Sequence, residues 1–352
     1  MQRVFLQMTN NEVWQQLLSL ESRDATSQWF ARIHSRELNA RRAKEINAAA
    51  KQAREYFRNA GEAAHSVRPL LTFYGVACLS RSLLLLLKAN GGEEGLTPSH
   101  GLETVDWGSV MKGDLAQALR SLSNLRVRIS TGLFSDFISN TKNRMSIHVN
   151  SSAVDWHLCY DVPQVGGEVT FDELCARIPD LQKDYMTTAG STVYSPISEM
   201  TFSDKDGFRA EIKETSFTNM RTFYEACGYT VTSHSIAADT KTFEQHVPLF
   251  VHSYIHKSFG SIPQLYLTIP FSSGARYSQL GITYMVAYIL GMLVRYYPTH
   301  WMALIQSEKG DTWWPTINRA QHLVEVSFPE LVIELLQDIL KESEAKAPAS
   351  VK

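Results

Sequence analysis

The residues with the clearest chemical potential are an arginine and a histidine that follow a long apolar segment. Arg295 and His300 are separated by four residues. Cleavage of RNA by its own 2′-hydroxyl needs a group that exchanges protons near neutral pH and a cation that stabilises the charged phosphorane. Histidine and arginine supply these two functions. We therefore consider a catalytic pair in which Arg295 binds the phosphate and His300 acts as acid or base.

A structural interpretation competes with this hypothesis. Pro298 lies between the two residues and is expected to end or kink the helix, so Arg295 and His300 need not face the same way. Arg295 can equally pair with a helix-end carbonyl or a carboxylate. Among 34 Lys+Arg and 11 His residues such spacings also arise by chance, and Arg58 with His65 is a second example. The structural interpretation is favoured for both pairs.

Anion binding is a further hypothesis for the segment that precedes the apolar helix. Ser272–Ser278 contains Gly274 and Arg276 at the expected helix start, where backbone N–H groups attract anions. We name Ser273 and Arg276 as candidate ligands of an anion or a nucleic acid. The segment lacks the lysine of a P-loop, and helix capping explains its serines equally well.

Aromatic residues gather at the end of the same helix. They could stack on the bases of single-stranded RNA, and Trp301 is our candidate for nucleic-acid binding. The aromatic residues within the 19 residues 296–314 are Tyr296, Tyr297, Trp301, Trp313 and Trp314. A hydrophobic joint over the helix end is favoured, because Lys309 is the only basic residue between Arg295 and Arg319.

Metal and thiol chemistry is not expected. His252 and His256, with His246 upstream, would stand one turn apart if residues 247–257 were helical, yet no carboxylate follows at a matching spacing. The four cysteines form no C-x-x-C pair. Cys78 is expected in the core, and His100 is expected in a hydrogen-bonded turn. We predict no metal and no cofactor.

Composition and charge limit the classes of partner. The chain is 44% hydrophobic and 20% charged, which is typical of a globular protein, and its net charge of −2 provides no global attraction to nucleic acid. RNA would therefore need a local patch. The first ten residues lack the apolar run of a secretory signal, so we expect a cytoplasmic protein. The uncharged residues 277–294 are expected to form a core helix, with no membrane association.

Periodicity predicts helices at both ends and strands between them. Ser66 is a possible N-cap before Pro69, and Thr170 with Glu173 has the spacing of a capping box. The expected helices are 10–64, 70–89, 111–123, 277–297, 319–326 and 330–342. The expected strands are 125–130, 146–149, 156–158, 208–215, 229–236 and 264–269.

These elements predict a mainly α-helical α+β fold. Helical parts at 1–124 and 271–345 are expected to pack together around a smaller β-containing region at 125–270. No linker interrupts the chain, so we predict a single domain over 1–345, followed by a frayed tail at 346–352.

Three parts of the sequence resemble a known bacterial family. The segment Arg68–Val76, continued through Leu83–Lys88 and Ser99–Leu102, resembles the N-terminal signature of the YaaC-like proteins. Thr170–Asp180 and Tyr284–Trp301 are similar to later stretches of that family. The resemblance implies a cytosolic bacterial protein without an established reaction. The Arg295-x4-His300 spacing is also similar, locally, to the R-x4–6-H pair of HEPN-type ribonucleases, which implies a dimeric, metal-independent nuclease.

Two functions follow as hypotheses. The first is a regulatory or partner-binding protein of the YaaC-like kind, with a possible role in defence, which acts through a protein partner or as a homodimer. The second is a metal-independent ribonuclease, a toxin or antiphage effector, that uses Arg295 and His300 on RNA.

Overall fold

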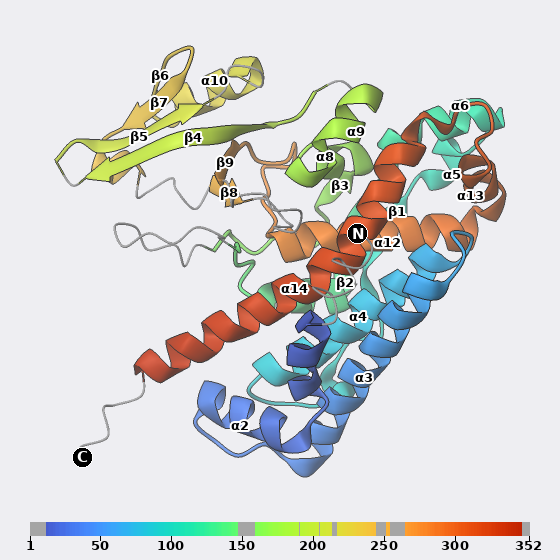
Figure 1. Cartoon of the computed structure of the whole chain (residues 1–352), viewed down its shortest axis with the longest axis vertical. Helices are drawn as coiled ribbons and strands as arrows, with labels where there is room; N and C mark the ends of the chain where they lie inside the picture. Colours follow the sequence, from blue (N-terminus) through green and yellow to red (C-terminus); the bar gives the residue numbers. More distant parts are fainter. Residues whose placement is uncertain are drawn as a thin grey trace.

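The computed structural model describes residues 12–146, 159–189, 191–203, 205–212, 217–243, 251–253 and 265–346. Over these ranges the protein is mainly α-helical and contains two small antiparallel sheets (Figure 1). The predicted α+β fold with a predominance of helix is therefore confirmed.

Long helices from both ends of the chain form one body. They are α2 (Arg23–His34), α3 (Ala40–Glu62), α4 (Arg68–Leu87), α12 (Gln279–Tyr296) and α14 (Trp314–Lys346). In Figure 1, α3 and α4 run side by side, and α14 crosses in front of α12. The predicted packing of the N- and C-terminal helical parts against each other is confirmed.

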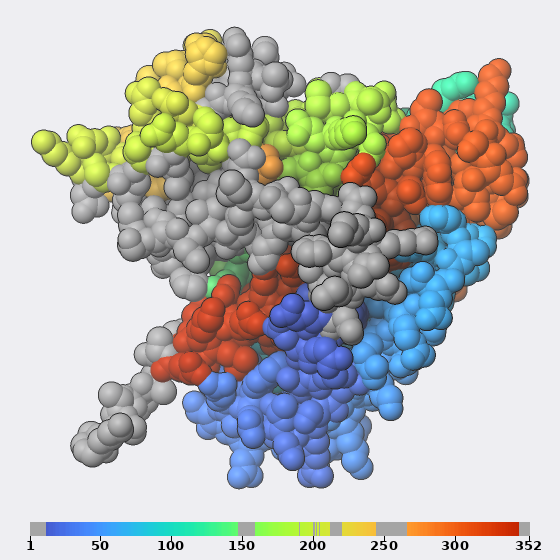
Figure 2. Space-filling view, viewed as in Figure 1, coloured from blue at the N-terminus to red at the C-terminus, as the bar shows by residue number. Residues whose placement is uncertain are grey.

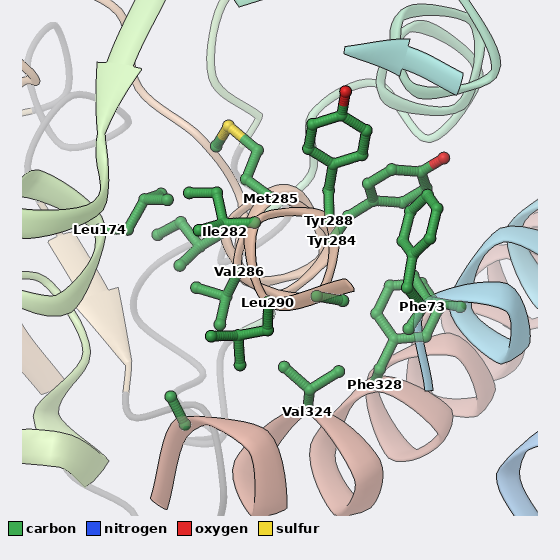
Figure 3. Close-up of a cluster of buried hydrophobic side chains, with 14 of the residues drawn as sticks. Phe73, Leu174, Ile282, Tyr284, Met285, Val286, Tyr288, Leu290, Val324 and Phe328 are labelled. Carbon is green, nitrogen blue, oxygen red and sulfur yellow. The ribbon is translucent and has the colours of Figure 1, made fainter. Parts of the chain in front are cut away.

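Helix α12 is the centre of this body. Every residue from Gln279 to Val294 is buried, as expected for a helix that is apolar on all sides. Figure 3 shows Tyr284 and Tyr288 on the side of α12 that faces Phe73 of α4, with ring centroids 6.2 Å and 5.4 Å from that of Phe73. Such contacts hold α4 and α12 together by apolar burial and edge-to-face ring packing.

A buried polar network joins α4 to α14. Glu325 of α14 is 7% exposed and accepts a hydrogen bond of 2.7 Å from Arg68 Nε. It also accepts bonds from Thr72 Oγ1 at 3.0 Å and from Gln321 Nε2 at 2.7 Å. The charge of Glu325 is thus compensated by an arginine and two further donors, which is what burial of a carboxylate requires.

Short helices complete the body and the lobe that adjoins it. They are α5 (Trp107–Val110), α6 (Leu115–Arg120), α7 (Leu133–Asn140), α8 (Phe171–Cys175), α9 (Gln182–Thr188), α10 (Phe217–Ala226) and α13 (Pro298–Ile305). The 3₁₀ turns are η1 (Leu18–Leu20), η2 (Glu93–Gly95), η3 (Leu122–Asn124), η4 (Pro179–Leu181) and η6 (Asp311–Trp313).

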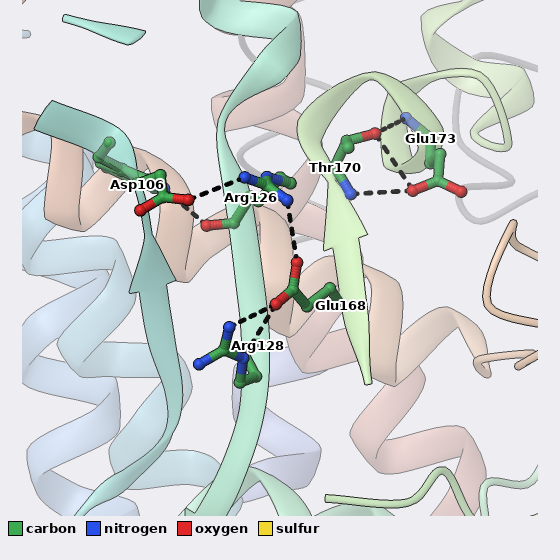
Figure 4. Close-up of polar contacts among 7 residues, drawn as sticks. Asp106, Arg126, Arg128, Glu168, Thr170 and Glu173 are labelled. Atoms are coloured by element: carbon green, nitrogen blue, oxygen red, sulfur yellow. Dashed lines mark hydrogen bonds and ion pairs between the residues drawn. The ribbon is translucent and has the colours of Figure 1, made fainter. Parts of the chain in front are cut away.

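A three-stranded sheet lies against the helical body. Its order is β1 (His100–Val105), β2 (Arg126–Gly132) and β3 (Glu168–Thr170). Strand β2 buries Val127 and Ile129 and exposes the alternate arginines. Figure 4 shows Arg126 between Asp106 and Glu168, at 3.1 Å and 3.2 Å, with Arg128 also on Glu168. These exposed pairs contribute only about 0–1 kcal/mol each to stability.

A six-stranded sheet forms a second lobe with its own apolar cluster. Its strands, in chain order, are β4 (Tyr194–Ser203), β5 (Gly207–Ile212), β6 (Thr230–Val231), β7 (Ser235–Ala238), β8 (Val251–Ser253) and β9 (Leu265–Thr268). In the sheet they are ordered β6-β7-β5-β4-β9-β8. Phe208 stacks on Phe243 at 4.1 Å inside the lobe, which projects from the helical body in Figure 2. The prediction of a single domain over 1–345 stays a prediction.

Several predicted elements are correct and others differ. Thr170 caps α8, and its hydroxyl and the Glu173 carboxylate form the predicted capping box, also visible in Figure 4. The expected helix over 111–123 is shorter in the structure, because α6 begins only at Leu115, after Gly113 with its φ of +94°, and ends at Arg120 before the 3₁₀ turn η3. Helix α4 begins after Val67, so Ser66 is not its N-cap.

Long-range packing explains the other differences. The predicted loop around His100 is strand β1, which forms because it pairs with β2. The two C-terminal helices are one helix, α14, which continues through Pro329 because buried residues on both sides, Phe328 and Leu331, hold it in the core. The expected strand 156–158 lies outside the described residues. Of the expected strand 146–149 only Ser146 is described, outside any strand, and of the expected tail 346–352 only Lys346, which ends α14.

Two segments pass a test of length and apolar composition for crossing a membrane. Helix α4 passes alone, although 67% of its apolar window is buried inside the protein. Helices α12 and α13 pass only as a pair, and they are bent by 107° at their junction. Both segments pack in the core of the helical body, and the core helix predicted over 277–294 is α12, which begins at Gln279.

Candidate functional site

The two residues of the predicted catalytic pair lie on either side of a sharp bend. Arg295 is in the last turn of α12, and His300 is in α13, which begins at Pro298. Arg295 Nη1 donates to Tyr74 Oη of α4 at 3.4 Å. His300 Nε2 lies 3.1 Å from the Met111 carbonyl. The expected break at Pro298 is confirmed, and the two side chains make their hydrogen bonds to different elements.

Arg295 instead shares its surroundings with His100. We use the term arginine–histidine site for Tyr74, Arg81, His100, Tyr288 and Arg295. The His100 ring packs against the Phe73 ring at 5.0 Å and lies 6.2 Å from that of Tyr288. Within the described part of the chain its ring nitrogens make no hydrogen bond.

Three elements bring the site together. Tyr74 and Arg81 lie seven residues apart on one face of α4, and Tyr288 and Arg295 lie seven apart on one face of α12. His100 opens β1, where its carbonyl accepts a 3.3 Å hydrogen bond from Tyr284 Oη. The next residue, a glycine, has a φ of +76°, and a Cβ there would lie 2.5 Å from the Phe134 nitrogen. Only glycine permits this close turn.

The electrostatics favour a neutral histidine beside two cations. Burial lowers the pKa of His100, and the charges of Arg295 and Arg81 lower it further. Both arginines are exposed, and neither forms an ion pair with a described residue. Burial also raises the pKa of Tyr288 to about 12, so its hydroxyl keeps its proton at neutral pH. Glu103 lies close enough to contribute to this shift and supplies an acidic edge.

This arrangement can bind an anion and exchange a proton with it. The arginines can hold the oxygens of a phosphate group, because charge-assisted hydrogen bonds of this kind are strong and directional. The unprotonated imidazole can accept a proton from a bound hydroxyl. A histidine with a shifted pKa beside unpaired cations is typical of functional sites.

The predicted anion ligands have separate environments. Ser273 is exposed, and its hydroxyl accepts a 3.4 Å bond from the Ala275 nitrogen, whereas Ser278 is the N-cap of α12. Arg276 is half-buried and lines a small cavity. Trp301 is 1% exposed and donates from Nε1 to the His65 carbonyl at 2.9 Å. Binding by Trp301 would require the core to open.

The aromatic set forms the hydrophobic joint that we favoured. Trp301 and Trp313 are buried, and Trp314 packs edge-on against Trp301 at 6.0 Å. Tyr296 differs, because it is 57% exposed and its ring lies 5.2 Å from the Arg295 guanidinium. One aromatic face is therefore open to solvent beside the arginine–histidine site.

The other histidines considered in the sequence lie away from the arginine–histidine site or outside the described residues. Arg58 pairs with Glu55, and the His65 ring packs edge-on against Trp314 at 5.4 Å. His252 lies in strand β8, so the helical spacing assumed for the histidine pair is wrong at this position, and His246 and His256 lie outside the described residues. No group of three or more potential metal ligands occurs among the described residues.

The sequence contained a signal for part of the site that we did not use. Arg81 is the only charged residue between Leu70 and Leu87, inside an otherwise apolar helix. An isolated charge in such a helix indicates a specific partner or a functional role. His100 was considered but assigned to a hydrogen-bonded turn. Its proximity to residues 81 and 295 depends on tertiary packing and leaves no local signal.

Comparison with known proteins places the chain in a protein family. The family model described as YaaC-like Protein matches residues 11–336, which is most of the chain and includes every residue of the arginine–histidine site. No curated protein and no solved structure matches the chain.

Proposed function

The chain belongs to the YaaC-like family, whose description names no reaction, and from this premise we propose that the protein binds single-stranded RNA at the arginine–histidine site and cleaves it without a metal ion. The observation that carries the proposal is the neutral, half-buried His100 beside Arg81 and Arg295, which lack carboxylate partners among the described residues.

The proposed reaction is a transesterification. His100 accepts the proton of a ribose 2′-hydroxyl, and the 2′-oxygen attacks the adjacent phosphorus. Arg81 and Arg295 stabilise the negative charge on the phosphorane oxygens. The 5′-oxygen leaves and takes a proton from solvent water, which produces a 2′,3′-cyclic phosphate and a 5′-hydroxyl. The proton on His100 then returns to solvent.

The exposed ring of Tyr296 supports a single-stranded substrate. An unpaired base can stack on this ring while its phosphate binds Arg295, the residue in contact with the ring. A near-neutral protein requires such a local patch, because its net charge of −2 gives no general attraction to RNA.

The test is cleavage of a labelled single-stranded RNA in the presence of EDTA. We expect His100→Gln to lower the cleavage rate by about 100-fold or more while RNA is still bound. Arg81→Gln and Arg295→Gln are expected to weaken binding, each reducing the slope of log affinity against log salt by about 0.7. His300→Gln is the matched control, and it also tests the original assignment of His300.

The outcomes are distinct. Loss of cleavage in His300→Gln but not in His100→Gln would return the catalytic role to the Arg295/His300 pair. DNA of the same sequence is expected to bind but remain intact, since it has no 2′-hydroxyl. Absence of both binding and cleavage at low salt in the wild type would refute the proposal and favour the other hypothesis, a regulatory protein that acts through a protein partner or as a homodimer.

A further inference from the structure

The hydroxyl of Tyr288 lies at the arginine–histidine site without a structural partner. The Tyr288 ring packs against the Phe73 ring, with 5.4 Å between their centroids (Figure 3), and the residue as a whole is 5% exposed. Among the described residues its hydroxyl has no hydrogen-bond partner, and this oxygen is not one of the fully buried polar atoms that lack one. The Tyr288 oxygen therefore reaches solvent, although the ring is held in the core.

Tyr288 and His100 are neighbours of the same guanidinium. The two rings lie 6.2 Å apart at an angle of 62°. Burial dominates the pKa shifts of both residues, but the charge of Arg295 acts to lower both values, so the guanidinium lies close to each group. Arg295 also follows Tyr288 by two turns on one face of α12. An anion held by Arg295 therefore has the imidazole and the phenol as neighbours.

The cleavage reaction requires a proton at its leaving group. Displacement at phosphorus places the attacking and the leaving oxygen roughly in line, on opposite sides of the phosphorus atom. The group that removes the proton of the 2′-hydroxyl therefore cannot protonate the 5′-oxygen in the same step. A second proton-transfer group on the other side of the phosphate accelerates the departure of this oxygen.

The protonation states of the two neighbours suit these two tasks. Burial raises the pKa of Tyr288 to about 12, so the phenol carries its proton at neutral pH. Bulk water has a pKa of about 15.7, which makes the phenol the stronger proton donor of the two. Burial lowers the pKa of His100, which leaves the imidazole free to accept a proton. Two groups whose environments move their pKa values apart are typical of an acid and a base in one site.

The hydroxyl of Tyr74 is the alternative donor near Arg295. It accepts a hydrogen bond of 3.4 Å from Arg295 Nη1, and the Tyr74 ring packs against Tyr56 of α3 at 5.6 Å. Within the part of the chain that the structure describes, no ring contact joins Tyr74 to His100. Tyr74 therefore orients the guanidinium, whereas Tyr288 faces the imidazole.

Given the RNA cleavage proposed above, on which this inference rests, we propose that Tyr288 is the general acid that protonates the leaving 5′-oxygen. As the bond between phosphorus and the 5′-oxygen breaks, its electron pair stays on the oxygen and takes the proton of the Tyr288 hydroxyl. The tyrosinate then takes a proton from water, so the proton still comes from solvent, through the phenol. His100 returns the proton of the 2′-hydroxyl to solvent, and the site is restored.

The test compares two RNA substrates of the same sequence, one with the ordinary linkage and one in which sulfur replaces the bridging 5′-oxygen. A thiolate leaves without protonation, because thiols have a pKa of about 8.5 and are far more acidic than alcohols. Tyr288→Phe should cleave the oxygen linkage about 100-fold or more slowly than the wild type. The same variant should cleave the sulfur linkage at nearly the wild-type rate and bind both substrates normally.

Three other variants provide the contrast. His100→Gln should be slow on both linkages, because the 2′-hydroxyl needs a base in either case. Tyr74→Phe should slow both linkages by the same factor, because it removes the hydroxyl that orients Arg295. Tyr56→Phe is the matched control and should cleave both linkages as the wild type does. Tyr288→Phe removes an oxygen without a partner among the described residues, so its melting temperature should match that of the wild type.

The outcomes separate this assignment from the proposed function. Slow cleavage of the oxygen linkage by Tyr288→Phe, restored by sulfur, would support the role of Tyr288. A wild-type rate of Tyr288→Phe on the oxygen linkage, or equal slowing of both linkages, would overturn this role and leave RNA cleavage by the protein intact. A wild-type protein that cleaves neither linkage would refute the proposed function, and the role of Tyr288 with it.

Discussion

Removal of the Glu325 carboxylate should weaken the junction between the two ends of the chain. Glu325 is 7% exposed and accepts hydrogen bonds from Arg68, Thr72 and Gln321. Glu325→Ala removes all of them at once and leaves the partly buried Arg68 guanidinium without its counter-charge. Breaking a buried pair in this way costs about 3–5 kcal/mol of unfolding free energy.

Urea unfolding followed by tryptophan fluorescence measures this loss. For a slope of about 3 kcal/mol per molar urea, the midpoint should fall by about 1–1.7 M. Glu308→Ala, at an exposed glutamate, is the control and should change stability by no more than about 0.5 kcal/mol.

A double variant distinguishes the loss of the Arg68–Glu325 ion pair from the loss of side-chain volume at position 325. Arg68→Met with Glu325→Leu replaces both charges by apolar groups of similar size, so no charge is left buried and alone. We expect it to recover at least half of the loss caused by Glu325→Ala. A loss below about 1 kcal/mol in the single variant, or no recovery in the double variant, would show that the pair does not hold the two ends together.

Three other perturbations test separate parts of the structure. Burial lowers the pKa of His34, so the folded protein prefers the neutral form of this side chain. The contribution of neutral His34 to the free energy of unfolding is complete above the pKa of the unfolded chain, about 6.5. It is lost as the pH falls through the lower pKa that His34 has in the folded protein. His34→Gln should therefore flatten the decline of the melting temperature below pH 6.5, and an unchanged profile would contradict this assignment. In Gly291→Ala the new Cβ would lie 2.8 Å from Phe73 Cβ, so α4 and α12 must move apart. We expect the free energy of unfolding, measured in urea, to fall by about 1–3 kcal/mol. A variant as stable as the wild type would show that the two helices adjust without cost. Thr170→Ala should cost about 1 kcal/mol, and a double-mutant cycle with Glu173→Ala should show coupling, whereas additive losses would argue against the capping box.

Local patterns predicted the features that depend on near neighbours. The apolar run over 277–294 became the buried helix α12, and the Thr170–Glu173 spacing became a capping box. The break at Pro298 was also predictable, because the missing N–H and the fixed φ of proline act within one helical turn. The same local argument was insufficient at Pro329, where burial on both sides outweighed one lost hydrogen bond.

The arginine–histidine site illustrates the limit of such reasoning. Residue types and spacing drew attention to Arg295 and paired it with His300, since both were near in the chain. The bend of 107° between α12 and α13 turns these residues to different neighbours. Packing of α4 against α12 and pairing of β1 with β2 bring residues 81 and 100 to Arg295 from about 200 positions away.

The amino-acid pattern alone therefore accounts for the helical character and for the capping box of Thr170 and Glu173, because each depends on side chains a few residues apart. The family was recognisable from several separate stretches of the same sequence. The candidate site was decided by contacts between distant segments. His100 is neutral, and Tyr288 keeps its proton, because of what surrounds them in the fold. Burial and partner geometry exist only after the helices and strands have packed, so no spacing in the chain encodes them.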